Sequence, residues 1–559
     1  MKFRKNRFLC MALCVTMLLT ACGGKEPSES TVSSDSGLSQ DGSSNVEDAG
    51  NEEGQAEGAD QKESSLWLDE ELEITILMQD NAAQPLTDYA PAQQEIHRKT
   101  NVKLVYQIVP TSSYTEKENV LLATNNFPDI IKVSAGNINS YAGEGIFVPL
   151  MQYVNEETMP NFYKLWKENE EVLSRWLVDG ELYAFPAIPR DEARNGFGVV
   201  LRTDLLEKHD LAIPSTFDEL IDVMARLKEL YPESIPYTGR KGTSQLLSTV
   251  SYMLGSGAGI YYDYDVDGGR YVFGPATEEF KAVLTFLNQC YERGVLDPDF
   301  ATTTSEQLQY KMTSGQSFMF IDNSGFGQNY TNILRTQEGL ENATLQVIPV
   351  PENSFGQRRA LAYDVKNTGR LFAINAKTER IEDVIRFIDW MYSEEGSNIS
   401  NYGVEGVSFY VDEDGEPQFI EDYINGVDDE GFNSKYYAVY SDLGITKLNF
   451  SLWCTNTKTQ FAIQKIVGDW NDVVEEYWEI INADPAYVDP YTAPSLTPEE
   501  TERVTDILTK LTTTLDQEYN KYIMGVEPID NWDKVIESIQ ADARELEEIY
   551  NGADARYAR

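Results

Sequence analysis

Short apolar runs alternate with amphipathic stretches in the first part of the chain. The runs 73–78, 102–109 and 129–133 are typical of buried strands. The stretches 86–100 and 114–124 have the apolar spacing of helices. Strands that alternate with helices predict βαβ units and a mainly parallel sheet, so we expect an α/β fold. Ligands of such sheets bind beyond the carboxyl ends of the strands.

The alternation resumes after a polar stretch and continues to the C-terminus. Ser215 or Thr216 with Glu219 is suited to cap a helix that follows, and Thr497 is suited to cap another. The remaining predicted elements are strands 198–202, 318–322 and 369–374, helices 217–230, 277–293 and 381–392, hairpins 264–273 and 411–419, and a helix from 498.

The first 21 residues have the layout of a secretory signal. Basic residues precede an apolar run, 8–19, which is too short for a stable membrane span. The small residues Thr20 and Ala21 then precede Cys22, and this stretch resembles a bacterial lipobox. The resemblance implies that Cys22 becomes the first mature residue and carries lipid, palmitate included, on its sulfur and amino group. The alternative is a signal peptide, 1–21, that is removed with Cys22 unmodified.

A polar segment follows the predicted signal. Residues 22–65 are rich in Ser, Gly, Asp and Glu and contain no aromatic residue. Such a segment cannot bury a core, so we predict a disordered acidic tether. A flexible chain of this length typically reaches roughly 35–40 Å.

Composition and charge limit the classes of function that the chain can have. The chain has 92 Asp and Glu against 45 Lys and Arg, a formal net charge of −47. This excess argues against a nucleic-acid partner, which requires Lys and Arg clusters, and against flat binding to an anionic membrane. With 41% apolar residues and 559 residues in all, the chain is expected to form two or more globular lobes.

The cysteines and histidines provide little evidence for a catalytic or metal-binding site. Two of the five cysteines leave with the predicted signal, so Cys290 and Cys454 remain besides Cys22. They could form one disulfide or be two free, buried thiols. His97 and His209 are the only histidines, and neither lies in a catalytic or metal-binding motif.

Four groups of residues resemble bacterial extracellular solute-binding proteins of ABC importers, in the lipoprotein branch that handles sugars. None of the four is a catalytic motif, but their order and spacing are specific, and the resemblance as a whole runs from about residue 72 to the C-terminus. Leu205 departs from the usual Trp of the second group. The groups are DGELYAFP at 179–186; LRTDLL at 201–206 with PSTFDEL at 214–220; FIDWMYS at 387–393 with NYGVEGV at 401–407; and YIMG at 522–525 with NWD at 531–533.

The resemblance implies a periplasmic-binding-protein-like fold of type II. Two α/β lobes would be joined by crossing segments and close on a ligand like a hinge. We expect lobe 1 at 66–195 and 357–410, and lobe 2 at 196–356 and 411–559, the last range including C-terminal helices.

Candidate ligand residues lie where the predicted strands or crossings end. A sugar site needs aromatic rings for apolar C–H faces and carboxylates or amides for hydroxyls. The alternative for each candidate is a turn residue or a core aromatic. The candidates are Asp80, Asn81, Tyr141, Glu144, Asp322, Asn323, Phe326, Tyr402, Glu405 and Trp453.

One acidic stretch raises the question of calcium. Asp263, Asp265, Asp267 and Gly268 fit the first half of a D-x-D-x-D-G calcium loop. Position twelve, which should be Glu, is Gly274. The family resemblance implies a structural calcium in relatives that bind alginate-type sugars. The alternative is a plain hairpin with an Asp-Gly turn, and we expect no other cofactor.

The leading hypothesis is therefore a non-enzymatic receptor. It captures a carbohydrate, an oligosaccharide in particular, and delivers it to ABC-transporter permease subunits. We expect a monomer on the extracellular face of the cell membrane, or in a periplasm, that contacts the membrane only through its lipid. The alternatives are a surface glycoside hydrolase, a sensor or adhesin lipoprotein, and a receptor for another solute such as a peptide.

Overall fold

The computed structural model describes most of the chain beyond the predicted tether. The predicted signal and tether, with Cys22, and the candidates Asn81, Asp267 and Trp453 lie outside the described residues. The described ranges are 68–80, 84–87, 89–190, 194–266, 268–363, 369–432, 434–445, 454–456, 458–468 and 472–557.

The first sheet has five strands in the order β2-β1-β3-β12-β4. Strands β1, β2 and β3 are parallel, and β12 pairs antiparallel with both β3 and β4. The expected parallel arrangement is thus confirmed for the three strands predicted from the N-terminal alternation. Their bounds are β1 Leu72–Gln79, β2 Val102–Val109, β3 Ile130–Val133, β4 Phe185–Pro186 and β12 Leu371–Ile374.

Both faces of this sheet are buried because apolar side chains occupy successive positions of its strands. Ile76 packs in the cluster that we call the first core, and its neighbour Leu77 packs in a smaller cluster on the other face with Tyr114. The helices that accompany the sheet are α1 Pro91–Thr100, α2 Tyr114–Ala123, α3 Ala135–Tyr141, α4 Pro160–Glu168, α5 Glu170–Leu173, α12 Ile381–Met391 and α13 Glu394–Tyr402.

The second sheet is built around β6 and is mostly antiparallel. Strand β6 pairs antiparallel with β9, β10 and β11, while β11 pairs parallel with β16. The expectation of a mainly parallel sheet is wrong here, because alternation of strands and helices does not determine strand direction. The bounds are β6 Asn195–Arg202, β9 Met319–Asn323, β10 Leu345–Val347, β11 Ala360–Tyr363 and β16 Tyr487–Val488.

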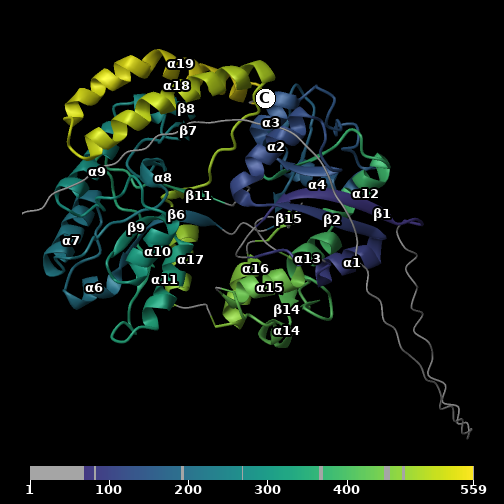
Figure 1. Ribbon diagram of the computed structural model, residues 1–559, viewed down its shortest axis with the longest axis horizontal. Coiled ribbons are helices and arrows are strands. Elements are labelled where there is room, and N and C mark those ends of the chain that lie inside the picture. The colour runs from purple at the N-terminus through teal and green to yellow at the C-terminus, as the bar shows by residue number, and fades with distance from the viewer. Residues whose placement is uncertain are drawn as a thin grey trace, which may run out of the picture. The chain divides into compact units, whose positions relative to one another are not determined.

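A larger cluster, the second core, surrounds this sheet and includes the two long C-terminal helices. Trp532 at the start of α19 is fully buried and stacks on Phe280 with ring centroids 5.6 Å apart. Figure 1 shows α18 and α19 running together across one end of the view. The helices here are α6 Thr203–Lys208, α7 Phe217–Leu230, α8 Gly242–Val250, α9 Phe280–Glu292, α10 Ser305–Thr313, α11 Gly325–Arg335, α17 Asp472–Ala483, α18 Pro498–Ile523 and α19 Trp532–Ala555.

Local signals determine where several helices begin. The Thr216 hydroxyl accepts a hydrogen bond of 3.1 Å from the Glu219 N–H, so Thr216 caps α7 as predicted. Thr497 caps α18 in a reciprocal arrangement with Glu500. Helix α1 is shorter than predicted because it begins at Pro91, whose ring suits the first helical position.

The division of the chain between the two cores differs from the predicted lobe boundaries. Phe419, Tyr440 and Ile463 pack in the first core, although 411–559 was expected in lobe 2. Strand β11 pairs with β6 of the second sheet, although 357–410 was expected in lobe 1. The remaining elements are β5 Ile188–Pro189, β7 Ile260–Asp263, β8 Arg270–Phe273, β13 Phe409–Val411, β14 Pro417–Phe419, β15 Cys454–Thr455, α14 Glu421–Gly426, α15 Lys435–Leu443, α16 Lys458–Ile466 and the 3-10 turns η1 Thr111–Ser113, η2 Ser174–Trp176, η3 Gly274–Ala276 and η4 Ile529–Asn531.

The two remaining cysteines lie in different cores. Cys290 packs in the second core and Cys454 in the first, and both are free and buried. Burial raises the pKa of each thiol. The alternative of two free thiols is therefore confirmed, and a disulfide between them is wrong.

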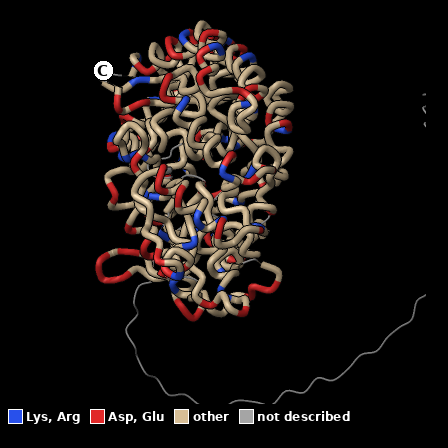
Figure 2. The backbone as a smooth tube through the Cα atoms, turned by 90° about the vertical axis from the view of Figure 1, so that its left-hand side faces the viewer, with Lys and Arg blue, Asp and Glu red and all other residues tan. Residues whose placement is uncertain are grey.

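The distribution of charge and the hydropathy of the helices are two further properties of the described chain. Figure 2 shows acidic positions distributed from one end of the chain tube to the other rather than gathered in one stretch. Among the described residues, no helix combines the length and apolar character that a membrane span requires.

Candidate functional site

One predicted site residue, Asp80, lies at the carboxyl end of a strand in the first sheet. The Asp80 N–H donates to the Val109 carbonyl at 2.7 Å, so Asp80 ties the ends of β1 and β2 together. Tyr141 ends α3, which follows β3, and Glu144 is exposed in the turn after it. Asp80 agrees with the expected edge of the sheet, although its backbone role also fits a turn residue. Glu144 does not, because Phe147, three residues later, bridges Asn375 beside the amino end of β3.

Sequence reasoning missed a lysine at the same edge. The Lys132 ammonium donates to the Gln79 side-chain oxygen at 2.7 Å. Burial, and secondarily the nearby Arg370, lower the pKa of Lys132 to about 8. The only signal was a lysine inside an otherwise apolar strand.

In the second sheet, Asp322 is paired inside the protein. Its carboxylate is 3% exposed and accepts two hydrogen bonds of 2.9 Å from the Arg240 guanidinium. The same guanidinium lies 5.0 Å from the centroid of the Phe326 ring. The Asn323 side-chain oxygen accepts the Gly325 N–H at 2.9 Å at the start of α11. Asp322 and Asn323 are thus both hydrogen-bonded within the protein, next to Phe326.

Phe326 lines a groove between the two cores, which we call the α11–α15 groove. Its volume is about 370 Å³. Phe326 and Tyr330 pack against the second core and stack with centroids 5.8 Å apart, while Tyr437 packs against the first core. The groove is lined by Gln309, Phe326, Asn329, Tyr330, Asn332, Ile333, Ser434 and Tyr437.

The lining residues define what this groove can bind. Their side chains are aromatic rings, carboxamides, one hydroxyl and one aliphatic group, and none of the lining residues that the structure describes is charged. Rings suit apolar C–H faces, and amides both donate to and accept from hydroxyl groups. Of the ten predicted ligand residues, the described groove contains Phe326 alone. Tyr437 was missed because it lies within helix α15, whereas the candidates were sought where predicted strands or crossings end.

Tyr402 belongs to the first core and Glu405 lies on the surface nearby, and neither lines the α11–α15 groove. Tyr402 is 6% exposed, packs on Phe409 and Phe419, and its hydroxyl accepts a 3.0 Å bond from the Asn456 amide. It lines a separate cavity of about 450 Å³ within the first core. Glu405 is exposed beside a different cavity of about 330 Å³.

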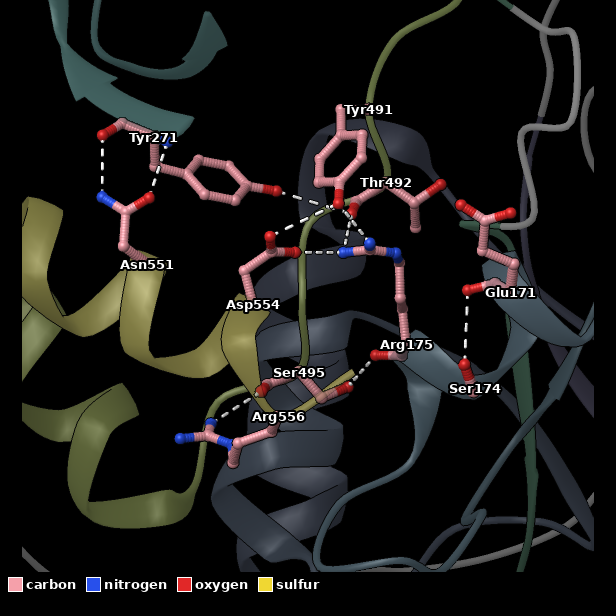
Figure 3. Close-up of polar contacts among 10 residues, drawn as sticks. All are labelled: Glu171, Ser174, Arg175, Tyr271, Tyr491, Thr492, Ser495, Asn551, Asp554 and Arg556. Atoms are coloured by element: carbon pink, nitrogen blue, oxygen red, sulfur yellow. Dashed lines mark hydrogen bonds and ion pairs between the residues drawn. The ribbon is translucent and has the colours of Figure 1, made fainter. Parts of the chain in front are cut away.

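A polar junction fastens the two cores together near the C-terminus. Arg175 lies in η2, beside Trp176, which packs against the first core. Its guanidinium forms an ion pair with Asp554 of α19 and a hydrogen bond with Tyr491 (Figure 3). Its guanidinium also lies 4.2 Å from the centroid of the Tyr491 ring. Ser495 donates to the Arg175 carbonyl from both its N–H, at 2.9 Å, and its hydroxyl, at 2.6 Å.

The location of each cavity makes the α11–α15 groove the candidate ligand site. A cavity of about 530 Å³ lies against α7 and α9 in the second core alone. Another, of about 320 Å³, is lined by residues of both cores but lies at the Arg175 junction, where hydrogen bonds fix their separation. The α11–α15 groove takes lining residues from both cores away from that junction (Figure 1).

Comparison with solved structures defines the class of the fold. The chain superposes on an alginate-binding protein, AlgQ2, crystallised without calcium ion, with a TM-score of 0.70 and 20% identity over 89% of this chain and 100% of that one. This protein therefore has the two-lobed α/β fold of solute-binding proteins.

The family follows from the sequence match. Residues 83–398 match the family model for bacterial extracellular solute-binding proteins, and the chain belongs to that family. Two curated relatives from Bacillus subtilis (strain 168) are lipoprotein LipO, 25% identical over 341 residues, and the polygalacturonan/rhamnogalacturonan-binding protein YtcQ, 26% identical over 335. Each match covers 58% of this chain and 64% of the relative's length.

Proposed function

We propose that this protein binds a neutral oligosaccharide in the α11–α15 groove. The observation that supports this most directly is that one uncharged groove receives aromatic rings from both cores and carboxamides from α10 and α11. Its volume of about 370 Å³ falls within the range of roughly 300–1,000 Å³ of small-molecule sites. A ligand that contacts both cores favours the closed arrangement over an open one by its differential affinity for the two.

The relatives support a carbohydrate, and the groove supports a neutral one. The names of YtcQ and AlgQ2 refer to polygalacturonan, rhamnogalacturonan and alginate. Those polymers carry carboxylates, which a site would neutralise with Arg or Lys. Here Arg240, the guanidinium beside the groove's Phe326, is already neutralised by Asp322.

The place of the protein in the cell follows from the same proposal. Lipid on Cys22 would retain the chain at the outer face of the membrane, with residues 22–65 as its tether. The protein would act there as a monomer and deliver its sugar to the permease subunits of an ABC importer. Tethering raises the effective concentration of the receptor near that permease.

Isothermal titration against matched saccharides tests the proposal. The panel contains neutral manno-, xylo-, galacto- and fructo-oligosaccharides, together with oligogalacturonate and alginate oligomers of equal length. We expect binding of at least one neutral oligomer and at least tenfold weaker binding of every uronate. Tighter binding of a uronate would overturn the neutral class. No binding of any saccharide would overturn the carbohydrate proposal itself.

A further inference from the structure

Asp263 and Asp265 lie at the end of a hairpin. Strands β7 and β8 pair antiparallel, with Asp263 opposite Arg270. The Tyr261 hydroxyl donates to the Asp263 carboxylate at 2.8 Å, and the Asp265 N–H donates to the same carboxylate at 3.1 Å. The hairpin predicted as the alternative to a calcium loop is therefore present, although Asp267 lies outside the described residues.

A guanidinium from another part of the chain faces both carboxylates. Arg359, which immediately precedes β11, donates from Nη1 to the Asp265 carboxylate at 2.7 Å. Its Nη2 lies 3.6 Å from the Asp263 carboxylate. The side chain is 7% exposed and its guanidinium lies 3.9 Å from the centroid of the Tyr252 ring. A buried cation thus already offsets one of the two negative charges of this acidic pair.

The described residues do not fit a calcium ion at this place. Calcium takes six to eight oxygen ligands, and a twelve-residue loop closes with a bidentate Glu. Position twelve is Gly274 in η3, and the described ranges contain no group of three or more His, Cys, Asp or Glu placed to bind a metal ion. A divalent ion beside the same two carboxylates would also be repelled by the Arg359 guanidinium.

We infer that the Arg359 guanidinium occupies the role of a divalent cation, so that this hairpin folds without calcium. The side chain is suited to the role because it delivers one fixed positive charge to both carboxylates. Its Nε and Nη2 have no hydrogen-bond partner among the described residues, so the Nη1 bond to Asp265, the attraction of both carboxylates and the Tyr252 ring hold it in place.

The hairpin also contacts the segment around Tyr491, so the role of Arg359 extends beyond the hairpin itself. The Tyr262 ring stacks on Tyr491 with centroids 3.6 Å apart, and the Tyr264 hydroxyl donates to the Asp489 carbonyl at 2.8 Å. Tyr491 also receives a hydrogen bond from Arg175 in the junction between the cores (Figure 3). Arg359 therefore supports, through the hairpin, the segment that joins the two cores.

Thermal unfolding of the full chain with calcium or with a chelator tests the inference. For the wild type we expect the same Tm, within about 1 °C, in millimolar calcium and in EGTA. Arg359→Gln should lower Tm by roughly 3–6 °C, because it leaves Asp263 and Asp265 without their counter-charge. The matched control is Arg293→Gln, since that arginine is 44% exposed and its partner Asp222 is 72% exposed. It should shift Tm by less than about 2 °C.

Two outcomes would overturn the inference. One is stabilisation of the wild type by calcium together with uptake of one ion per chain in a calorimetric titration. The other is an Arg359→Gln protein that unfolds at the wild-type temperature. If Arg359→Gln does not fold, the calcium titration of the wild type decides alone: absence of binding heat supports the inference and stoichiometric binding contradicts it.

Discussion

Arg240 and Asp322 form a two-pronged ion pair, with both N–O distances at 2.9 Å, next to the α11–α15 groove. Because the carboxylate is 3% exposed, removal of the guanidinium leaves a buried charge without a partner. We expect Arg240→Met to lower the free energy of unfolding by about 3–5 kcal/mol, measured by urea denaturation.

The double variant Arg240→Met/Asp322→Asn provides the internal control for this pair. It removes both charges, so it should recover most of the lost stability. Arg226→Met is the control for the loss of an arginine side chain in general, because Arg226 is 53% exposed. This variant should change the free energy of unfolding by less than about 1 kcal/mol. Equal losses in the single and double variants would contradict a specific role for the pair.

The Arg175 junction should contribute comparably to stability. Arg175 is 6% exposed and serves Asp554, Tyr491 and the Thr492 carbonyl at once. We expect Arg175→Met to cost about 3–5 kcal/mol in denaturant unfolding. Arg503→Met, which breaks the exposed pair with Glu545, should cost less than about 1 kcal/mol. Similar losses in the two variants would show that the junction does not fasten the cores.

Lys132 should make stability depend on alkaline pH. Its folded pKa of about 8 lies below the ordinary lysine value. At pH values between these two pKa values, the folded state therefore binds fewer protons than the unfolded state. Stability from this group therefore rises as pH increases through that window. At pH 7, Lys132→Met should be more stable than the wild type by up to about 3 kcal/mol, and the difference should shrink by pH 10.

Urea denaturation at both pH values measures this difference. Lys103→Met on the neighbouring β2 is the control, because that lysine is partly exposed and paired with Glu73. Its difference from the wild type should stay small at both pH values. A Lys132→Met difference that does not change between pH 7 and pH 10 would rule out a lowered lysine pKa.

Thiol titration tests the placement of the cysteines. In a chain without the signal and with Cys22→Ser, only Cys290 and Cys454 remain. Both are buried and their thiol pKa values are raised, so Ellman's reagent should react slowly in the native protein. Two thiols per chain should react at once after unfolding without reductant; none reacting would indicate a disulfide.

Local patterns in the sequence predict much of the fold. The apolar runs of β1, β2 and β3 and the Thr216 cap were visible because each depends on neighbouring residues. The lobe boundaries could not be predicted from such local patterns, because they depend on which core a helix covers. Helix α15 packs against the first core, and nothing in its spacing indicates that.

The site was harder to predict than the fold for the same reason. Phe326 was found because it follows a buried strand, but its partner across the groove, Tyr437, lies more than a hundred residues further along the chain. Asp322 looked like a ligand residue because the sequence does not show that Arg240 pairs with it. Asn81 and Trp453 remain predictions, since both lie outside the described residues.

The affinity of groove variants for the neutral oligosaccharide that binds the wild type is the most direct test. Phe326→Ala and Tyr437→Ala each remove one ring, from opposite cores, and each should weaken binding at least about tenfold in calorimetry. Tyr410→Ala, which removes a half-exposed ring on β13, should bind like the wild type. Wild-type affinity in both groove variants would contradict a carbohydrate site between α11 and α15.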